Sequence, residues 1–172
     1  MKFEGTLPTA KSPTVKFTNT AGPNGHWDFP EQMGNGVGFI YVIYDTYLNR
    51  GYLGKKQFLG AGQLNKGKES NWKKYTSSSP VLNELIKVRP REEFEFICLE
   101  QYKSKGTLSY SETWSLCLIE APTTREWYNT LIEKVSWPVK EPISERHKER
   151  LSAVCQRIIQ KRTGSSLSLI SS

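Results

Sequence analysis

Tyrosines and lysines concentrate in one short stretch of this 172-residue chain, where they could act on a phosphate group. The set comprises Tyr41, Tyr44, Tyr47, Tyr52, Lys55, Lys56, Lys73 and Lys74. An unaided tyrosine is a poor base because its pKa is about 10. Neighbouring cations favour the phenolate, and they also hold phosphate oxygens. The pattern indicates phosphate chemistry, with ordinary aromatic packing across a hairpin as the alternative.

The charge of the chain is uneven and favours a polyanionic partner. The formal net charge is +7. Residues 55–74 hold six lysines and one glutamate, and residues 139–162 hold seven cations and three acids. Because the net charges of these two segments add up to more than the net charge of the whole chain, the remaining residues are net negative. The basic character is therefore located in two patches.

Composition argues against several other classes of protein. No run approaches the ~18 apolar residues of a membrane-spanning helix, and the N-terminal segment lacks the apolar core of a secretory signal. The cysteines Cys98, Cys117 and Cys155 are too few and too far apart for a disulfide framework or a zinc site. Two histidines, His26 and His147, are a poor basis for a histidine-rich metal site. We therefore expect a cytoplasmic protein that does not engage a membrane.

The elements that must position these residues follow from hydrophobic patterning. The run from Phe39 to Tyr44 predicts a buried strand, and the turn before Tyr52 predicts its return as a hairpin. The other predicted elements are a helix opened by Ser79 and Pro80 with Leu82, Leu85 and Ile86 inward, a strand over 94–100, a helix over 111–119 capped by Ser109 or Ser111, a short element over 126–135, and a helix over 144–161 with Ile143, Leu151, Val154, Ile158 and Ile159 inward. This order predicts an α+β fold, with a small sheet covered by helices.

The two ends of the chain are predicted to be additions to one body. Proline, glycine and asparagine in the N-terminal part predict an irregular extension, with one strand over 14–18 and with Trp27 and Phe29 pinning it to the body. The predicted domains are an extension over 1–37, a body over 38–135, a linker and helical arm over 136–164, and a flexible tail over 165–172.

Several pieces of the sequence, in order, resemble the GIY-YIG nuclease family. They are Gly38-Phe39-Ile40-Tyr41, Tyr52-Leu53-Gly54, the segment Asn71–Ser79, Phe94-Glu95-Phe96-Ile97, Leu108-Ser109-Tyr110-Ser111-Glu112, and Tyr128-Asn129. The two motif tyrosines are eleven residues apart, as is usual in that family's hairpin. The resemblance covers about residues 38–130 and implies a small antiparallel three-stranded sheet flanked by helices.

The resemblance also implies catalytic roles. Tyr41 would be the base for an attacking water, with Tyr52 assisting, and Glu112 would hold Mg²⁺ or Mn²⁺. One carboxylate suffices, because Mg²⁺ keeps several waters and takes phosphate oxygens. Lys55 and Lys56 would lower the tyrosine pKa and neutralise phosphate. From the residues alone, Glu112 is explained as an acid at a helix N-terminus, which the helix dipole favours.

One family feature is absent from this sequence. GIY-YIG members usually carry an arginine early in the first helix, and here no arginine lies between Arg50 and Arg89. Lys73 or Lys74 would replace it, although lysine lacks the bidentate fork of arginine, or Arg50 or Arg89 would fold in from elsewhere. We assign Lys74 to catalysis, and Lys73 and Asn129 to DNA contact.

Residues 142–152 resemble the short modular DNA-binding motif that trails many homing endonucleases. Ser144 is the expected N-cap of this helix. The implied DNA contacts are Arg146, His147, Lys148, Arg150, Arg157 and Lys161, with His147 at the surface. The alternative is a solvated helix face with ion pairs along its length. We expect an arm that lies along the duplex and contacts its phosphates.

The sequence thus predicts a magnesium-dependent endonuclease that acts on double-stranded DNA as a phage homing-like or nicking enzyme. A restriction or repair nuclease would differ only in biological role. A monomer is favoured, and one active site per monomer favours nicking. The alternative is a catalytically weak or inactive nucleic-acid-binding protein that retains the nuclease scaffold, because the family arginine is missing.

Overall fold

The computed structural model describes residues 22–60, 62–132 and 139–168. Its strands and helices are β1 (Gly38–Asp45), β2 (Arg50–Gln57), α1 (Pro80–Val88), β3 (Phe94–Tyr102), α2 (Lys105–Leu118) and α3 (Glu145–Ser168), with short 3-10 turns at Trp72–Lys74, Arg91–Glu93 and Ala121–Thr123. The three strands form an antiparallel sheet in the order β2-β1-β3. The predicted α+β fold with a three-stranded antiparallel sheet is confirmed.

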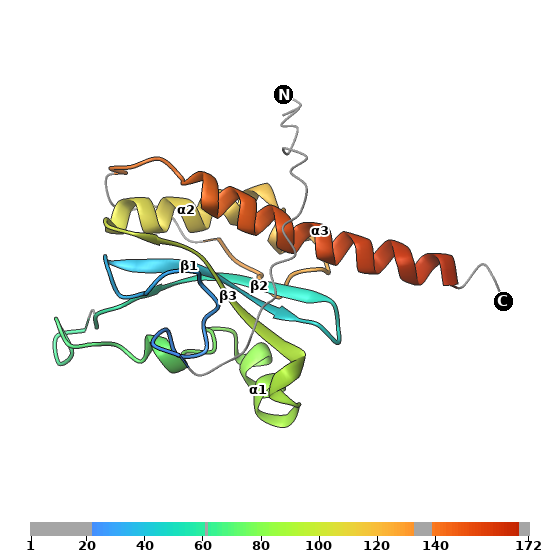
Figure 1. Ribbon diagram of the computed structural model, residues 1–172, viewed down its shortest axis with the longest axis horizontal. Helices are drawn as coiled ribbons and strands as arrows, with labels where there is room; N and C mark the ends of the chain where they lie inside the picture. The colour runs from blue at the N-terminus through green and yellow to red at the C-terminus, as the bar shows by residue number, and fades with distance from the viewer. Residues whose placement is uncertain (1–21, 61, 133–138, 169–172) are drawn as a thin grey trace.

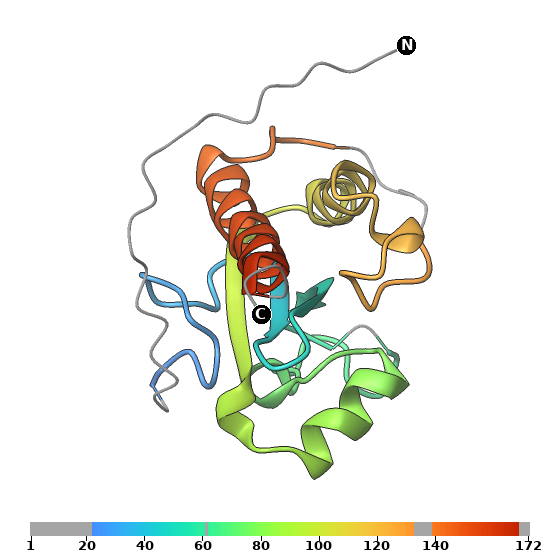
Figure 2. The same ribbon diagram turned by 90° about the vertical axis from the view of Figure 1, so that its right-hand side faces the viewer.

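The central strand β1 is buried along its whole length, because helices cover both faces of the sheet. Phe39, Tyr41 and Ile43 pack toward α1 and the N-terminal segment. Ile40 and Val42 pack toward α2 and α3 on the opposite face. Figures 1 and 2 show α1 beneath the sheet, and α2 and α3 side by side above it. A strand buried on both faces reads as a continuous apolar run rather than an alternating one.

The first helix begins as the sequence predicts. The side chain of Ser79 accepts a hydrogen bond from the backbone N–H of Leu82, and Pro80 takes the first helical position. Leu82 is buried, and Leu85 and Ile86 pack against the same core. This amphipathic stripe fixes α1 under the sheet.

The second helix begins earlier than predicted. Ser104, not Ser109 or Ser111, is the N-cap, and its hydroxyl accepts from the backbone N–H of Thr107. Gly106 lies in the first turn and is buried, so tertiary packing overrides its poor helix propensity. Glu112 therefore lies in the middle of α2, and its reading as an acid of the first helical turn is wrong.

The edges of the sheet are covered by irregular segments. Asp28 pairs in parallel with Ile97 on the outer edge of β3, and Trp27 and Phe29 are buried beside it, so the predicted pinning of this segment is confirmed. Trp127 pairs in parallel with Gly51 on the outer edge of β2. The predicted strand over 14–18 and the end of the predicted element over 126–135 lie outside the described residues.

Helix α3 lies across the sheet and packs against β3 and α2. Leu151, Val154 and Ile158 are buried in the same core as α2, as predicted. Ile159, predicted to face inward, is 59% exposed. The division of the chain into a nuclease body and a DNA-binding arm stays a prediction, and within the described residues this helix completes the core.

No helix in the described parts of the chain is long and apolar enough to cross a membrane.

Candidate active site

The two motif tyrosines lie on the α1 face of the sheet, on neighbouring strands. Tyr41 stands opposite Gly54 in the β1–β2 register, and its ring lies 6.3 Å from that of Tyr52. The Tyr52 hydroxyl lies 2.7 Å from the hydroxyl of Ser78. A Cβ on Gly54 would lie 2.5 Å from Tyr41 Oη, so only glycine leaves room for the phenol there. The hairpin register thus brings both tyrosines to one place, as predicted.

Glu112 reaches the same place from the other face of the sheet. Its Oε1 accepts a hydrogen bond from the backbone N–H of Lys55 at 3.1 Å, and its Oε2 lies 2.5 Å from Lys55 Nζ. The side chains of Glu112 and Lys55 are 13% and 21% exposed. Because β2 is an edge strand, the Glu112 carboxylate of α2 can reach the outer edge of β2 beside Gly54. The site therefore straddles the edge of β2.

The hydroxyl of Tyr41 is shielded from water, and this decides its protonation. Burial, followed by the neighbouring hydroxyls of Tyr52 and Tyr75 and the carboxylate of Glu112, raises the pKa of Tyr41 well above its ordinary value. The prediction that Lys55 and Lys56 lower it is wrong for this structure, because desolvation outweighs them. At neutral pH the Tyr41 hydroxyl keeps its proton.

A third tyrosine, which sequence reasoning did not single out, completes this group. Tyr75 packs edge-on against Tyr41, with the ring centroids 6.0 Å apart. Lys56 places its Nζ 4.2 Å from the centroid of the Tyr75 ring, a cation–π geometry. Burial lowers the pKa of Lys56. Tyr75 belongs to the same Trp-Lys-Lys-Tyr segment as Lys73 and Lys74. Its aromatic type is the only feature of the sequence that indicates contact with Tyr41 and Lys56.

Asn129 acts on the backbone of β2. Its Oδ1 accepts from Leu53 N at 2.9 Å, and its Nδ2 donates to Leu53 O at 2.7 Å. The side-chain amide of Asn129 thus bonds both the N–H and the C=O of Leu53, as the backbone of a neighbouring strand would. Asn129 is 8% exposed. In this structure the residue fixes the edge that carries Gly54 and Lys55, and DNA contact through it stays a prediction.

No arginine takes the place of the missing family arginine among the described residues of the site. Arg89 forms a bidentate ion pair with buried Asp45, at 2.6 and 2.8 Å. Arg50 donates to Trp127 O and stacks over the Tyr128 ring. The suggestion that one of these arginines folds into the site is wrong, because both are engaged elsewhere.

The two candidate lysine replacements lie at the surface beside the tyrosines. Lys73 and Lys74 are exposed at the turn that precedes Tyr75. Lys73 Nζ lies 3.3 Å from Glu69 and 5.3 Å from the Trp72 ring. Lys73 O accepts from His26 N, and His26 Nε2 lies 2.9 Å from Tyr75 O, so the N-terminal segment supports this turn. Their roles stay predictions.

The cations of α3 are mostly paired with acids of the body. Arg150 contacts Asp28 and the carbonyl of Cys98, and Arg157 forms a bidentate pair with Glu95. The further pairs are Arg146 with Glu31 and Glu100, Lys148 with Glu145, Arg162 with Glu126, and Lys161 with the carbonyl of Thr46. DNA contact through these side chains stays a prediction that requires those pairs to open.

His147 is corrected from a surface residue to a core residue. It is 0% exposed, with Nδ1 2.9 Å from Tyr102 Oη and Nε2 2.8 Å from Ser115 Oγ. Burial, followed by the charge of Lys148, lowers its pKa to about 3, so it is neutral at pH 7. Its spacing in the helix could have placed it inward, since it lies four residues before Leu151.

Glu112 fits the role of a ligand for a hard divalent cation. No group of three or more His, Cys, Asp or Glu side chains gathers in the part of the chain that the structure describes. A single carboxylate is nevertheless a suitable partner for Mg²⁺ that retains waters and binds a substrate phosphate. The Lys55 ammonium already sits on Glu112 Oε2, so a cation there would share or displace it.

Comparison with protein families identifies the family to which the chain belongs. Residues 24–132 match the family model described as "Putative endonuclease segE, GIY-YIG domain", which covers more than half of the chain. No curated protein and no solved structure matches the chain. The matched segment contains both tyrosines, Gly54, Lys55 and Glu112. The chain belongs to the GIY-YIG endonuclease family.

Proposed function

We propose that this nuclease domain hydrolyses phosphodiester bonds of double-stranded DNA with the help of a divalent cation. One observation carries the proposal: Tyr41, Tyr52 and Glu112, from three separate elements, converge on Gly54 and Lys55 at the edge of β2. Phosphodiester hydrolysis needs an oriented water, compensation for growing negative charge, and a proton acceptor. The tyrosines supply the first of these and Glu112 and Lys55 the second, while the proton of the attacking water would pass to solvent, because Tyr41 keeps its own proton.

The chain's own residues divide this work. Glu112 would hold the cation through its carboxylate, and Lys55 would be released from Glu112 to neutralise the scissile phosphate. Tyr41 holds a proton at Oη and, together with Tyr52, would orient the water beside the phosphorus. Bound at Glu112, Mg²⁺ would lower the pKa of the attacking water and stabilise the developing charge.

A homing-like nicking enzyme of phage origin is the specific form that we propose. One site per chain, acting without a partner subunit, cuts one strand in one encounter. The proposal therefore includes a monomer and nicked circles as the first product.

A second candidate is a DNA-binding protein without catalysis. Two observations favour it: the described residues of the site include no arginine, with Arg50 and Arg89 held elsewhere, and the pKa of Tyr41 is raised. Both features reduce the charge stabilisation and the basicity that hydrolysis requires.

Incubation of supercoiled plasmid with the full chain separates the two candidates. We expect nicked circles with Mg²⁺ or Mn²⁺ and intact plasmid with EDTA. A gel-shift assay of the same samples measures binding. DNA that is bound but never nicked in either metal would favour the second candidate.

A further inference from the structure

The segment between β2 and the turn at Trp72 forms a folded loop, here named the 58–71 loop. Leu59 pairs with Glu69, and Gly60 pairs with Lys66. Backbone hydrogen bonds join Gly60 N to Lys68 O at 2.9 Å, Lys68 N to Asn65 O at 3.1 Å, and Ser70 N to Phe58 O at 2.7 Å. Among its described residues, the loop is therefore held in one shape rather than free to sample many. A preorganised loop loses little conformational entropy on binding a ligand.

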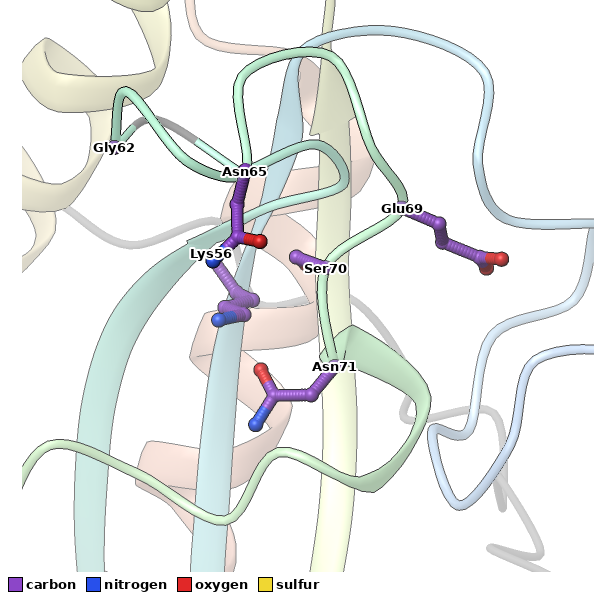
Figure 3. Close-up of a pocket in the computed structure, with 7 residues that line it drawn as sticks. Lys56, Gly62, Asn65, Glu69, Ser70 and Asn71 are labelled. Carbon is purple, nitrogen blue, oxygen red and sulfur yellow. The ribbon is translucent and has the colours of Figure 1, made fainter.

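The loop lines a half-open pocket of about 370 Å³ (Figure 3). Its lining residues are Lys56, Gly60, Gly62, Asn65, Glu69, Ser70 and Asn71. Figure 3 shows the side chains of Lys56, Asn65 and Asn71 converging on one space, with Glu69 turned away from it. Within the described residues, neither the Asn65 nor the Asn71 amide has a side-chain hydrogen-bond partner. This volume lies at the lower end of the range for ligand sites, roughly 300–1,000 Å³, and suits one base rather than a larger group.

The cations of this loop differ from those of α3. Lys66 and Lys68 are exposed, and within the described ranges no ion pair involves either of them. On α3, by contrast, Arg150 and Arg157 are already paired with Asp28 and Glu95. Binding a phosphate is more favourable in free energy for an unpaired lysine than for a paired cation, because no existing ion pair must be broken. Of the two basic patches, the 58–71 loop is thus the better phosphate contact.

The pocket adjoins the candidate active site at one residue, Lys56. Lys56 lines the pocket, and its ammonium also lies over the ring of Tyr75, which packs edge-on against the ring of Tyr41. A nucleic acid whose phosphate reaches Lys56 beside Tyr75 would therefore bring a neighbouring nucleotide over Asn65 and Asn71.

We propose that the 58–71 loop reads the DNA sequence next to the cleaved bond, a proposal that rests on the proposed function. Lys66 and Lys68 bind phosphates, and Asn65 and Asn71 hydrogen-bond to a base edge. An asparagine amide matches the donor and acceptor pair of adenine, N6 and N7, in the major groove. The loop thus selects an adenine within a few positions of the cut.

The phosphate contacts are tested by the salt dependence of binding. The full chain with Glu112→Gln is titrated with a labelled duplex at several salt concentrations, so that catalysis plays no part. Adding Lys66→Ala or Lys68→Ala should lower the slope of log K against log salt by about 0.9 each. Lys87→Ala, an equal change of charge at an exposed site on α1, should leave the slope unchanged. Unchanged slopes in both loop variants would overturn the phosphate contacts.

The base contacts are tested by sequencing duplexes that the same Glu112→Gln protein retains from a randomised library. We expect enrichment of adenine at one position, which Asn65→Ala or Asn71→Ala reduces roughly five- to hundredfold. Gln160→Ala on α3 removes an exposed amide elsewhere and should retain the enrichment. Absence of any base preference in the parent, or its persistence in both asparagine variants, would contradict base reading. Failure of the wild-type chain to nick plasmid would instead contradict the proposed function alone.

Discussion

Lys55 holds both oxygens of Glu112, one through its backbone N–H at 3.1 Å and the other through its ammonium at 2.5 Å. This double contact attaches the middle of α2 to the edge of β2. It also occupies the carboxylate oxygen that a divalent cation would use. The candidate metal ligand and a candidate phosphate ligand thus neutralise each other until substrate arrives.

Removal of this lysine should strengthen metal binding and weaken cleavage. In Lys55→Ala, Glu112 no longer shares its charge with an ammonium, and we expect Mn²⁺ to bind about tenfold more tightly. Nicking should decrease because the phosphate loses a cation. Isothermal titration with Mn²⁺ measures the first effect, and Lys103→Ala at an exposed site is the control. Weaker Mn²⁺ binding in Lys55→Ala would contradict this competition.

A methyl group at Gly54 should displace Tyr41. The Cβ of Gly54→Ala would lie 2.5 Å from Tyr41 Oη and 2.7 Å from its Cζ, so the ring must move. We expect destabilisation of about 1–3 kcal/mol and a loss of nicking well beyond that. Gly164→Ala is the matched control, since nothing lies within 4 Å of its added Cβ. Chemical denaturation and single-turnover nicking measure the two effects, and normal nicking by Gly54→Ala would show that the position of Tyr41 is not critical.

Helix α3 should be inseparable from the stability of the body. Leu151 is 2% exposed, so Leu151→Ala should cost about 2–5 kcal/mol in the free energy of unfolding. Ile159 is 59% exposed on the same helix, and Ile159→Ala should cost within about 0.5 kcal/mol. Urea unfolding compares the two. Equal small effects would mean that the helix is a detachable arm after all.

Acid should destabilise the fold through His147. Its ordinary pKa of 6.5 is lowered by burial to about 3 in the folded protein. Between these values the unfolded chain binds the additional proton, so stability decreases as the pH falls. Between pH 7 and pH 5 this residue alone should account for about 2 kcal/mol.

His147→Gln removes that titration and should flatten the decline of stability with pH. Urea unfolding at pH 5, 6 and 7 measures the slope. His26→Gln is a useful comparison, because burial lowers the pKa of His26 to about 4 and its removal also reduces the slope. An identical pH slope in wild type and His147→Gln would show that folding does not lower the pKa of His147.

The sequence predicts the sheet and its tyrosines well, because these depend on local patterns. The hairpin register follows from the short connection between β1 and β2, and it places Tyr41 opposite Gly54. The start of α2 differs from the prediction because Ser104, Ser109 and Ser111 are all possible caps in the sequence, and tertiary packing of the buried first turn selects Ser104. Element existence follows from periodicity, and element boundaries depend on tertiary contacts.

The pairing of charges could not be predicted, because it depends on long-range contacts. The sequence shows seven cations in and just before α3. It does not show that Asp28 pairs with Arg150, or that Glu95 pairs with Arg157, because both acids lie far away in the chain. The pKa of Tyr41 was misjudged for the same reason. Sequence distance to lysines does not reveal burial, and burial determines the shift.

The role of Glu112 is the central claim, and its substitution tests it most directly. Single-turnover nicking of supercoiled plasmid in Mg²⁺ is compared for the wild type, Glu112→Gln and Glu149→Gln, where Glu149 is an exposed acid on α3. We predict that Glu112→Gln binds DNA but nicks at least about a hundredfold more slowly, and that Glu149→Gln matches the wild type. Nicking by Glu112→Gln at the wild-type rate would contradict the assignment of this site.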